Sequence, residues 1–221
     1  MSEPATRFTR FANRSAIRGG IVCNAVLVFF ELVAGVMAFV PFRTYELSYY
    51  TNWSNLLCLI SSLLYLIFAA RVLKDPQLDT IPKGIKVLRF VTTTALLLTL
   101  IVVAAVLCPM AHSWDQLFTG QWLYHHFLCP VLSFLSLVLF ERTPPLRFRD
   151  TFLSVGYTAV YAAVMVPLCA KGMEPPYPFL AILTQPVWLS ILYVLALLLL
   201  TFLVAWFLVW TDGESGRKRS G

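Results

Sequence analysis

Charged residues are scarce in this chain. Lys, Arg, Asp and Glu make up 13% of its 221 residues, hydrophobic residues make up 59%, and the mean hydropathy is +0.76. Soluble domains carry roughly 25% charged residues, so this composition excludes an ordinary soluble domain and indicates an integral membrane protein. The segments between the apolar runs are too short to form a separate soluble core, and we expect one domain.

Patterns that would bind a metal or build a disulfide framework are also lacking. Among the five cysteines no pair has the spacing of zinc ligands. The cysteines fall within or at the ends of the apolar runs, where thiols usually pack as small hydrophobic groups. They are Cys23, Cys58, Cys108, Cys129 and Cys169. We therefore expect no metal and no cofactor.

Long apolar runs dominate what is present. A helix needs about 20 apolar residues to cross the ~30 Å hydrocarbon layer. Six segments qualify, at about residues 20–40, 50–70, 88–110, 122–140, 151–169 and 187–210. The first is too long for a signal peptide and lacks a small-residue cleavage site close behind it. The sequence predicts an all-α, polytopic membrane protein with a six-helix transmembrane domain at 20–210, an N-terminal segment at 1–19 and a tail at 211–221.

The basic residues are distributed unevenly. Fifteen of the 17 Lys and Arg fall at the two ends of the chain and in the second and fourth connections, whereas Arg43 and Lys171 alone serve the other connections. Basic residues concentrate on the cytoplasmic side of a membrane. This pattern predicts cytoplasmic N and C termini in a multi-pass protein of the plasma (inner) membrane. It makes the lipid bilayer, not nucleic acid, the expected partner for the net charge of +6.

The second apolar run opens with small polar residues, in the stretch YYTNWSNLL (residues 49–57). Side chains at steps of three and four share one face of a helix. They are Thr51, Asn55, Cys58, Ser62 and Tyr65. Two interpretations are open: Thr51 or Asn52 caps the helix above small packing residues, or the stripe is the polar wall of a cavity.

The fourth run opens with WLYHHFLCP (residues 122–130), which contains His125 and His126. Adjacent residues point about 100° apart on a helix, so at most one histidine faces the side continued by Ser133. The second and fourth runs cross the membrane in the same direction, which puts Thr51 and His126 at similar depth. A hydroxyl, an imidazole and unpaired N–H groups of a helix start can supply a nucleophile, a base and an oxyanion site. An interfacial histidine bonded to lipid or loop is the alternative.

Three further features bear on this hypothesis. Glu31 lies in the middle of the first run, where a carboxyl group is costly, and acts either as a structural anchor or as a proton site. Asn55, one turn below Thr51, is a candidate oxyanion donor, with Asn52 and Ser54 as candidate site support. The Pro-rich segment KGMEPPYPFL (residues 171–180) is typical of an extended loop with an aromatic tip that covers a site.

Four stretches together resemble the androgen-induced-protein family of six-span membrane proteins, in particular its bacterial relatives. They are YYTNWSNLLCLISSLLYL (49–66), YHHFLCPVLSFLSLVLFE (124–141), RTPPLRFRD (142–150) followed by FLSVGYTAVY, and PYPFL (176–180). The resemblance implies a threonine hydrolase that cleaves fatty acid esters of hydroxy fatty acids. It assigns Thr51 as the nucleophile and His126 as the base, with His125 as the alternate base.

Other function classes remain open on the sequence. A small-solute or proton-coupled transporter would use the same polar interior, with Glu31 as the coupling site, although no internal repeat is visible. A non-catalytic protein that binds lipid or organises partners would be indifferent to Thr51. Acyl transfer differs from hydrolysis only in the acceptor. The sequence sets neither the acyl specificity nor the oligomeric state.

Overall fold

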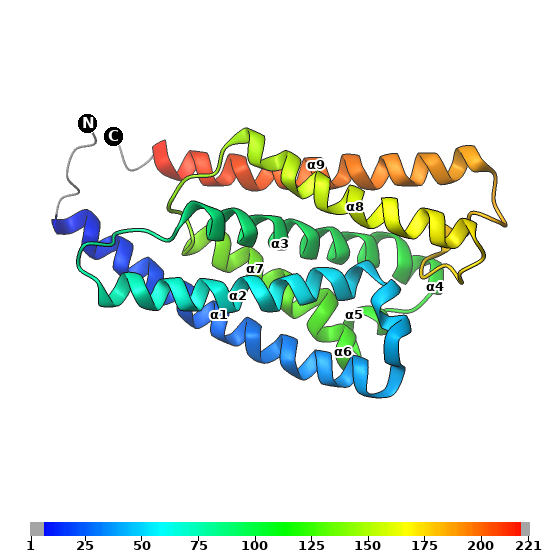
Figure 1. Cartoon of the computed structure of the whole chain (residues 1–221), viewed down its shortest axis with the longest axis horizontal. Coiled ribbons are helices and arrows are strands. Elements are labelled where there is room, and N and C mark those ends of the chain that lie inside the picture. The colour runs from blue at the N-terminus through cyan, green and yellow to red at the C-terminus, as the bar shows by residue number, and fades with distance from the viewer. Residues whose placement is uncertain (1–6, 218–221) are drawn as a thin grey trace.

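The bundle consists of long helices that run along one axis (Figure 1). The computed structural model describes the backbone of residues 7–217 and the side chains of residues 13–38 and 45–213. In this part of the chain all regular structure is helical, and six helices are long and apolar enough to cross a membrane. The prediction of an all-α, multi-pass membrane protein with six spans is confirmed. Of the predicted end segments, residues 1–6 and 218–221 lie outside the described part; the remainder continues the first and last helices.

Four spans are single long helices and two are composite. The four are α1 (Arg7–Phe42), α2 (Tyr50–Lys74), α8 (Thr151–Ala170) and α9 (Val187–Arg217), and the composite spans contain α3 (Lys83–Val102) and α7 (Cys129–Leu139). The third span extends α3 through a π-helical turn, η2 (Val103–Leu107), into α4 (Cys108–Ala111). The fourth joins α6 (Gly120–Trp122), a second π-helical segment, η3 (Leu123–Leu128), and α7.

Short elements close the bundle at its ends. They are the 3₁₀ turns η1 (Arg43–Ser48), η4 (Phe148–Asp150) and η5 (Pro178–Leu180), and the helix α5 (Asp115–Phe118). The described chain begins and ends at the same end, which we name the terminal end (Figure 1). The opposite, distal end holds η1, α4, α5 and η5. An even number of spans requires this arrangement.

Helix α3 lies at the centre of the bundle. It packs against α2, α7, α8 and α9, while α1 packs against α2 and α7. Two glycines of α1 allow close packing: a Cβ at Gly20 would lie 2.2 Å from the Tyr65 hydroxyl, and a Cβ at Gly19 would lie 2.4 Å from the Phe140 ring. Large apolar side chains such as Leu195 and Leu199 of α9 point outward, as expected where lipid surrounds the protein.

The structure corrects the sequence interpretation of two basic residues. Lys86 and Arg89, which we assigned to a connection, lie in α3 and are 2% and 0% exposed. Lys86 pairs with Asp212 at 2.8 Å and also donates to the Glu141 backbone carbonyl. Arg89 pairs with Glu141 at 3.2 Å. The predicted start of the third span, near residue 88, is therefore too late. Charged residues usually indicate a connection, and the sequence does not show that these two have buried partners.

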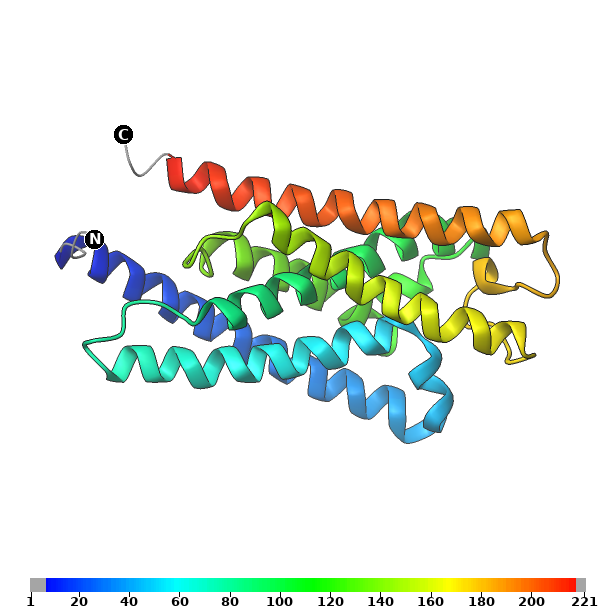
Figure 2. The same ribbon diagram turned by 45° about the horizontal axis from the view of Figure 1, so that its top comes forward.

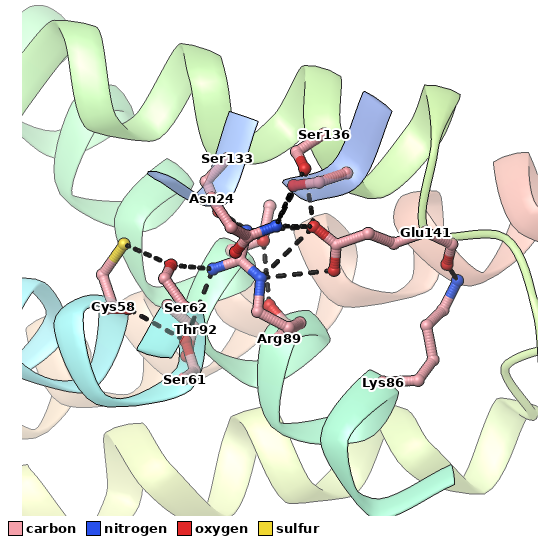
Figure 3. Close-up of polar contacts among 12 residues, drawn as sticks. Asn24, Cys58, Ser61, Ser62, Lys86, Arg89, Thr92, Ser133, Ser136 and Glu141 are labelled. Carbon is pink, nitrogen blue, oxygen red and sulfur yellow. Dashed lines mark hydrogen bonds and ion pairs between the residues drawn. The ribbon is translucent and has the colours of Figure 1, made fainter. Parts of the chain in front are cut away.

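A hydrogen-bonded network surrounds this pair (Figure 3). The Arg89 guanidinium donates to hydroxyls on α2 and α7, and Asn24 of α1 donates to Glu141 Oε1 at 2.9 Å. The hydroxyl partners are Ser61, Ser62 and Ser133. We name Asn24, Ser61, Ser62, Arg89, Ser133 and Glu141 the Arg89 cluster. Hydrogen bonds from side chains of different helices satisfy the buried charges, and the cluster thereby connects α1, α2, α3 and α7.

Candidate functional site

Thr51 lies in the first turn of α2 at the distal end, and its side chain is buried. Its Oγ1 is 3.3 Å from Nε2 of His126. Among the described side chains none caps α2, and the Asn52 amide donates instead to the backbone oxygen of Glu46 at 2.7 Å and to its carboxylate at 2.9 Å. The helix-cap interpretation of this stretch is therefore wrong, and the hydroxyl of Thr51 faces another helix.

The orientation of His126 is fixed from its other side. Its Nδ1 is hydrogen-bonded to the backbone carbonyl oxygen of Gln116 in α5. A carbonyl oxygen only accepts, so Nδ1 carries the proton and Nε2 of the neutral ring is the acceptor. The Thr51 hydroxyl thus donates to Nε2. A hydroxyl, a base and a group that orients the base form the arrangement used to activate nucleophiles.

Tyr177 completes the surroundings of the Thr51 hydroxyl. It immediately precedes η5, and its hydroxyl lies 3.4 Å from Thr51 Oγ1 and accepts from the Thr51 backbone N–H at 3.4 Å. Burial raises the pKa of Tyr177, so its phenol keeps its proton at neutral pH. Sequence analysis did not assign this residue a role. The available signal was the aromatic tip of the Pro-rich segment 171–180.

The two adjacent histidines face different neighbours. His125 is buried, and its Nε2 lies 3.7 Å from Oε2 of Glu31. The structure therefore brings His126, and not His125, to Thr51. Both histidines belong to η3, which is a π-helical segment. The other π-helical segment, η2, lines the same cavity as these histidines. Segments of this kind are often found at functional sites.

Asn55 and Ser54 hold the backbone of Thr51. The Asn55 amide donates to the Thr51 carbonyl oxygen at 2.7 Å, and the Ser54 hydroxyl donates to the same oxygen at 2.9 Å. The donor group of Asn55 is engaged there and does not point at the hydroxyl. Tyr177, and not Asn55, is thus the side chain whose hydrogen-bonding group lies beside the Thr51 hydroxyl.

Glu31 is not next to Thr51. It borders a second cavity of about 440 Å³ beside α1 and α2, together with Asn52, Asn55 and His125. Glu31 Oε1 and Asn55 Oδ1 are buried and have no hydrogen-bond partner among the described residues. Asn52 and His125 also line the cavity at Thr51 and His126, so the two spaces adjoin, whereas Thr51 and His126 do not line the second one.

Thr51, His126 and Tyr177 border a cavity of about 580 Å³, which we name the polar cavity. Polar side chains on its wall include Glu46, Gln116 and Gln121. Both π-helical segments contribute to it, through Val103 and Leu107 of η2 and the histidines of η3. A buried hydroxyl with a positioned base thus faces a space that can admit a substrate group and water.

Comparisons with protein-family models, with curated proteins and with solved structures found no match to this chain. Its function is therefore argued from the site itself.

Proposed function

We propose that the protein is an intramembrane hydrolase of fatty-acyl esters, with Thr51 as nucleophile and His126 as general base. The observation that carries the proposal is the 3.3 Å approach of a buried hydroxyl to the free nitrogen of a histidine whose other nitrogen is held by Gln116. The resemblance of the sequence to the androgen-induced-protein family supports the same assignment and suggests esters of hydroxy fatty acids as substrates.

The proposed reaction has two steps, acylation of Thr51 and hydrolysis of the acyl-threonine. His126 Nε2 takes the Thr51 proton as Oγ1 bonds to the ester carbonyl carbon; the bond to the alcohol oxygen then breaks and His126 returns the proton to the leaving alcohol. In the second step His126 takes a proton from water, the hydroxide bonds to the acyl carbon, and the bond to Thr51 breaks. The proton returns to Thr51, and a fatty acid is released.

Tyr177 is the donor for the oxygen that becomes negative. Its hydroxyl lies 3.4 Å from Thr51 Oγ1 and accepts from the Thr51 N–H; since Thr51 donates its own proton to His126, the phenol O–H can donate on this side. A donor placed beforehand in a site of low dielectric stabilises developing charge without reorganising. Stabilisation of the transition state by this donor compensates for the weak nucleophilicity of a threonine hydroxyl.

The charge pattern supports the proposed topology. Without the buried Lys86 and Arg89, thirteen basic residues still serve the ends and the second and fourth connections, against two elsewhere. We place both termini in the cytoplasm and the protein in the plasma (inner) membrane. The site at the distal end then lies below the outer surface, within reach of lipids of the outer leaflet.

Turnover by purified variants tests the proposal. With a fluorogenic fatty-acyl ester in lipid nanodiscs, Thr51→Ala should lower kcat at least about a thousandfold and Thr51→Ser should retain activity. His126→Gln should lower kcat by about 10²–10⁴-fold, while the matched His125→Gln stays within a few fold. Thr51→Ala protein that hydrolyses the ester as fast as wild type contradicts the proposal.

Two related activities give different results in the same assay. An acyltransferase passes the acyl group to an added alcohol faster than to water. A transporter that couples to Glu31 loses its function in Glu31→Gln and keeps it in Thr51→Ala, because Glu31 borders the other cavity.

A further inference from the structure

Thr51 borders two spaces, of which one has charged and amide side chains in its wall and the other has none. Besides the polar cavity, it borders a narrow cavity of about 50 Å³ on its other side, which also shares Tyr177, Val103 and Leu107. Much of the wall of this apolar cavity is aliphatic or aromatic. These wall residues include Leu98, Val102, Tyr161, Ala162, Leu197 and Leu198. Among the described residues that line it there is no charged side chain and no histidine.

The apolar cavity lies next to a groove on the outside of the bundle. This groove of about 450 Å³ lies between α8 and α9, which run side by side in both views (Figures 1 and 2). The two spaces share Ala162, Phe179, Leu180, Val194 and Leu198. Small residues of α8, Ala159 and Ala163, leave the groove open toward the side that lipid surrounds. The apolar cavity beside Thr51 and the lipid-facing groove therefore adjoin each other, and we name the two together the apolar path.

We propose that this path binds the acyl chain of the ester, and that the polar cavity holds its alcohol part and the hydrolytic water. The inference rests on the proposed function. It adds which half of the substrate each space takes and where the chain enters.

The chemistry of the second step requires this division. The acyl group stays bonded to Thr51 until water attacks, and that water must lie beside His126 Nε2 to lose its proton. His126 borders the polar cavity and not the apolar one. An acyl chain in the polar cavity would displace the water, whereas a chain in the apolar cavity leaves it in place.

The energetics of transfer favour the same division. An acyl chain that slides in from lipid between α8 and α9 stays in apolar surroundings throughout, whereas a chain in the polar cavity would lie against polar groups and water. The alcohol part carries the more polar groups and faces Gln116 and Gln121. The narrow space beside Thr51 selects straight acyl chains over chains branched near the carbonyl.

Chain-length selectivity tests the placement of the acyl chain. Ala162 borders both the apolar cavity and the groove, so Ala162→Phe closes their junction. The variant should lower the ratio of kcat/KM for a palmitoyl ester to that for an acetyl ester by about tenfold or more, because only the long chain reaches the junction. Val160→Phe, on the lipid-facing side of the same helix, is the matched control and should change kcat/KM for neither ester. An equal effect of Ala162→Phe on both esters, or no effect, overturns the placement.

A binding readout separates this inference from the proposed function. In Thr51→Ala protein, a palmitoyl ester with a diazirine on the acyl chain should label α8 and α9, competed by unlabelled ester and lost in Ala162→Phe but not in Val160→Phe. A diazirine on the alcohol part should label segments around Gln121. Acyl labelling of the polar cavity, or no competed labelling, overturns the inference. If the expected labelling is seen but wild type does not turn over the ester, the proposed hydrolysis is contradicted and the placement of the acyl chain still stands.

Discussion

Tyr177 is the residue at the site that depends most on tertiary structure. It comes from a connection far along the chain from Thr51, yet its hydroxyl lies 3.4 Å from both Oγ1 and the backbone nitrogen of that residue. A T-shaped contact with the Tyr49 ring, at 5.7 Å between centroids, and stacking on Phe179 at 5.0 Å hold the phenol in place.

Removal of this hydroxyl isolates its contribution. Tyr177→Phe should lower kcat about 10²-fold and change KM by less than about threefold, because the donor acts on charge that develops in the transition state. The aromatic contacts are kept, so the thermal unfolding temperature should stay near that of wild type. Steady-state kinetics checks the prediction. A rise in KM with kcat unchanged would show instead that Tyr177 acts in substrate binding.

Depth along the helices was enough to predict that Thr51 and His126 lie at one level, since their spans run in the same direction. The choice between His125 and His126 required the structure, because η3 is π-helical and the 100° spacing of an α-helix does not hold there. The position of Tyr177 was not predictable, because a Pro-rich connection has no period that sets its direction.

At the scale of elements, the approach of α1 to α2 depends on Gly20. An added Cβ there would lie 2.2 Å from the Tyr65 hydroxyl, and Tyr65 is fully buried. In contrast, an added Cβ at Gly35 of the same helix would meet nothing within 4 Å. The two glycines therefore differ in packing while sharing a helix.

Alanine substitution at the two glycines gives opposite expectations. Gly20→Ala should destabilise the protein by about 1–3 kcal/mol, because the Tyr65 ring must move in a filled interior. Gly35→Ala should be neutral or slightly stabilising, because alanine favours a helix over glycine. Thermal unfolding in detergent, followed by tryptophan fluorescence, measures both. Equal unfolding temperatures for the two variants would contradict the close packing of α1 on α2.

The boundaries of the elements were harder to predict than their existence. Six apolar runs predicted six spans, but α3 begins at Lys83 and not near residue 88. The reason is physical: Lys86 and Arg89 have acidic partners that come from the end of α7 and from α9. A hydropathy pattern registers their charge and has no information on the partners that make burial tolerable.

At the scale of the whole molecule, the Arg89 cluster and the site occupy different parts of the bundle. The cluster joins α1, α2, α3 and α7 through one ion pair and its hydrogen bonds (Figure 3). The site lies toward the distal end, with α8 and α9 at its apolar side. In this account the cluster holds the helices that position Thr51 and His126. We propose that the α8 and α9 pair admits the acyl chain.

Breaking the central ion pair should affect the whole fold. Arg89→Met leaves the Glu141 carboxylate buried without its partner and should cost about 3–5 kcal/mol. The double variant Arg89→Met with Glu141→Gln should recover part of this loss, because no uncompensated charge remains. Unfolding in a denaturing detergent measures both. A single variant as stable as wild type would contradict the role of the cluster.

The central claim is that Thr51 is an activated nucleophile. Membranes that contain wild type, Thr51→Ala, His126→Gln or His125→Gln are treated with a fluorophosphonate probe, and the adduct is located by peptide mass spectrometry. We predict an adduct on Thr51 in wild type and in His125→Gln, strongly reduced in His126→Gln and absent in Thr51→Ala. Labelling that persists in folded Thr51→Ala protein, or folded wild type that carries no adduct on Thr51, would contradict the account.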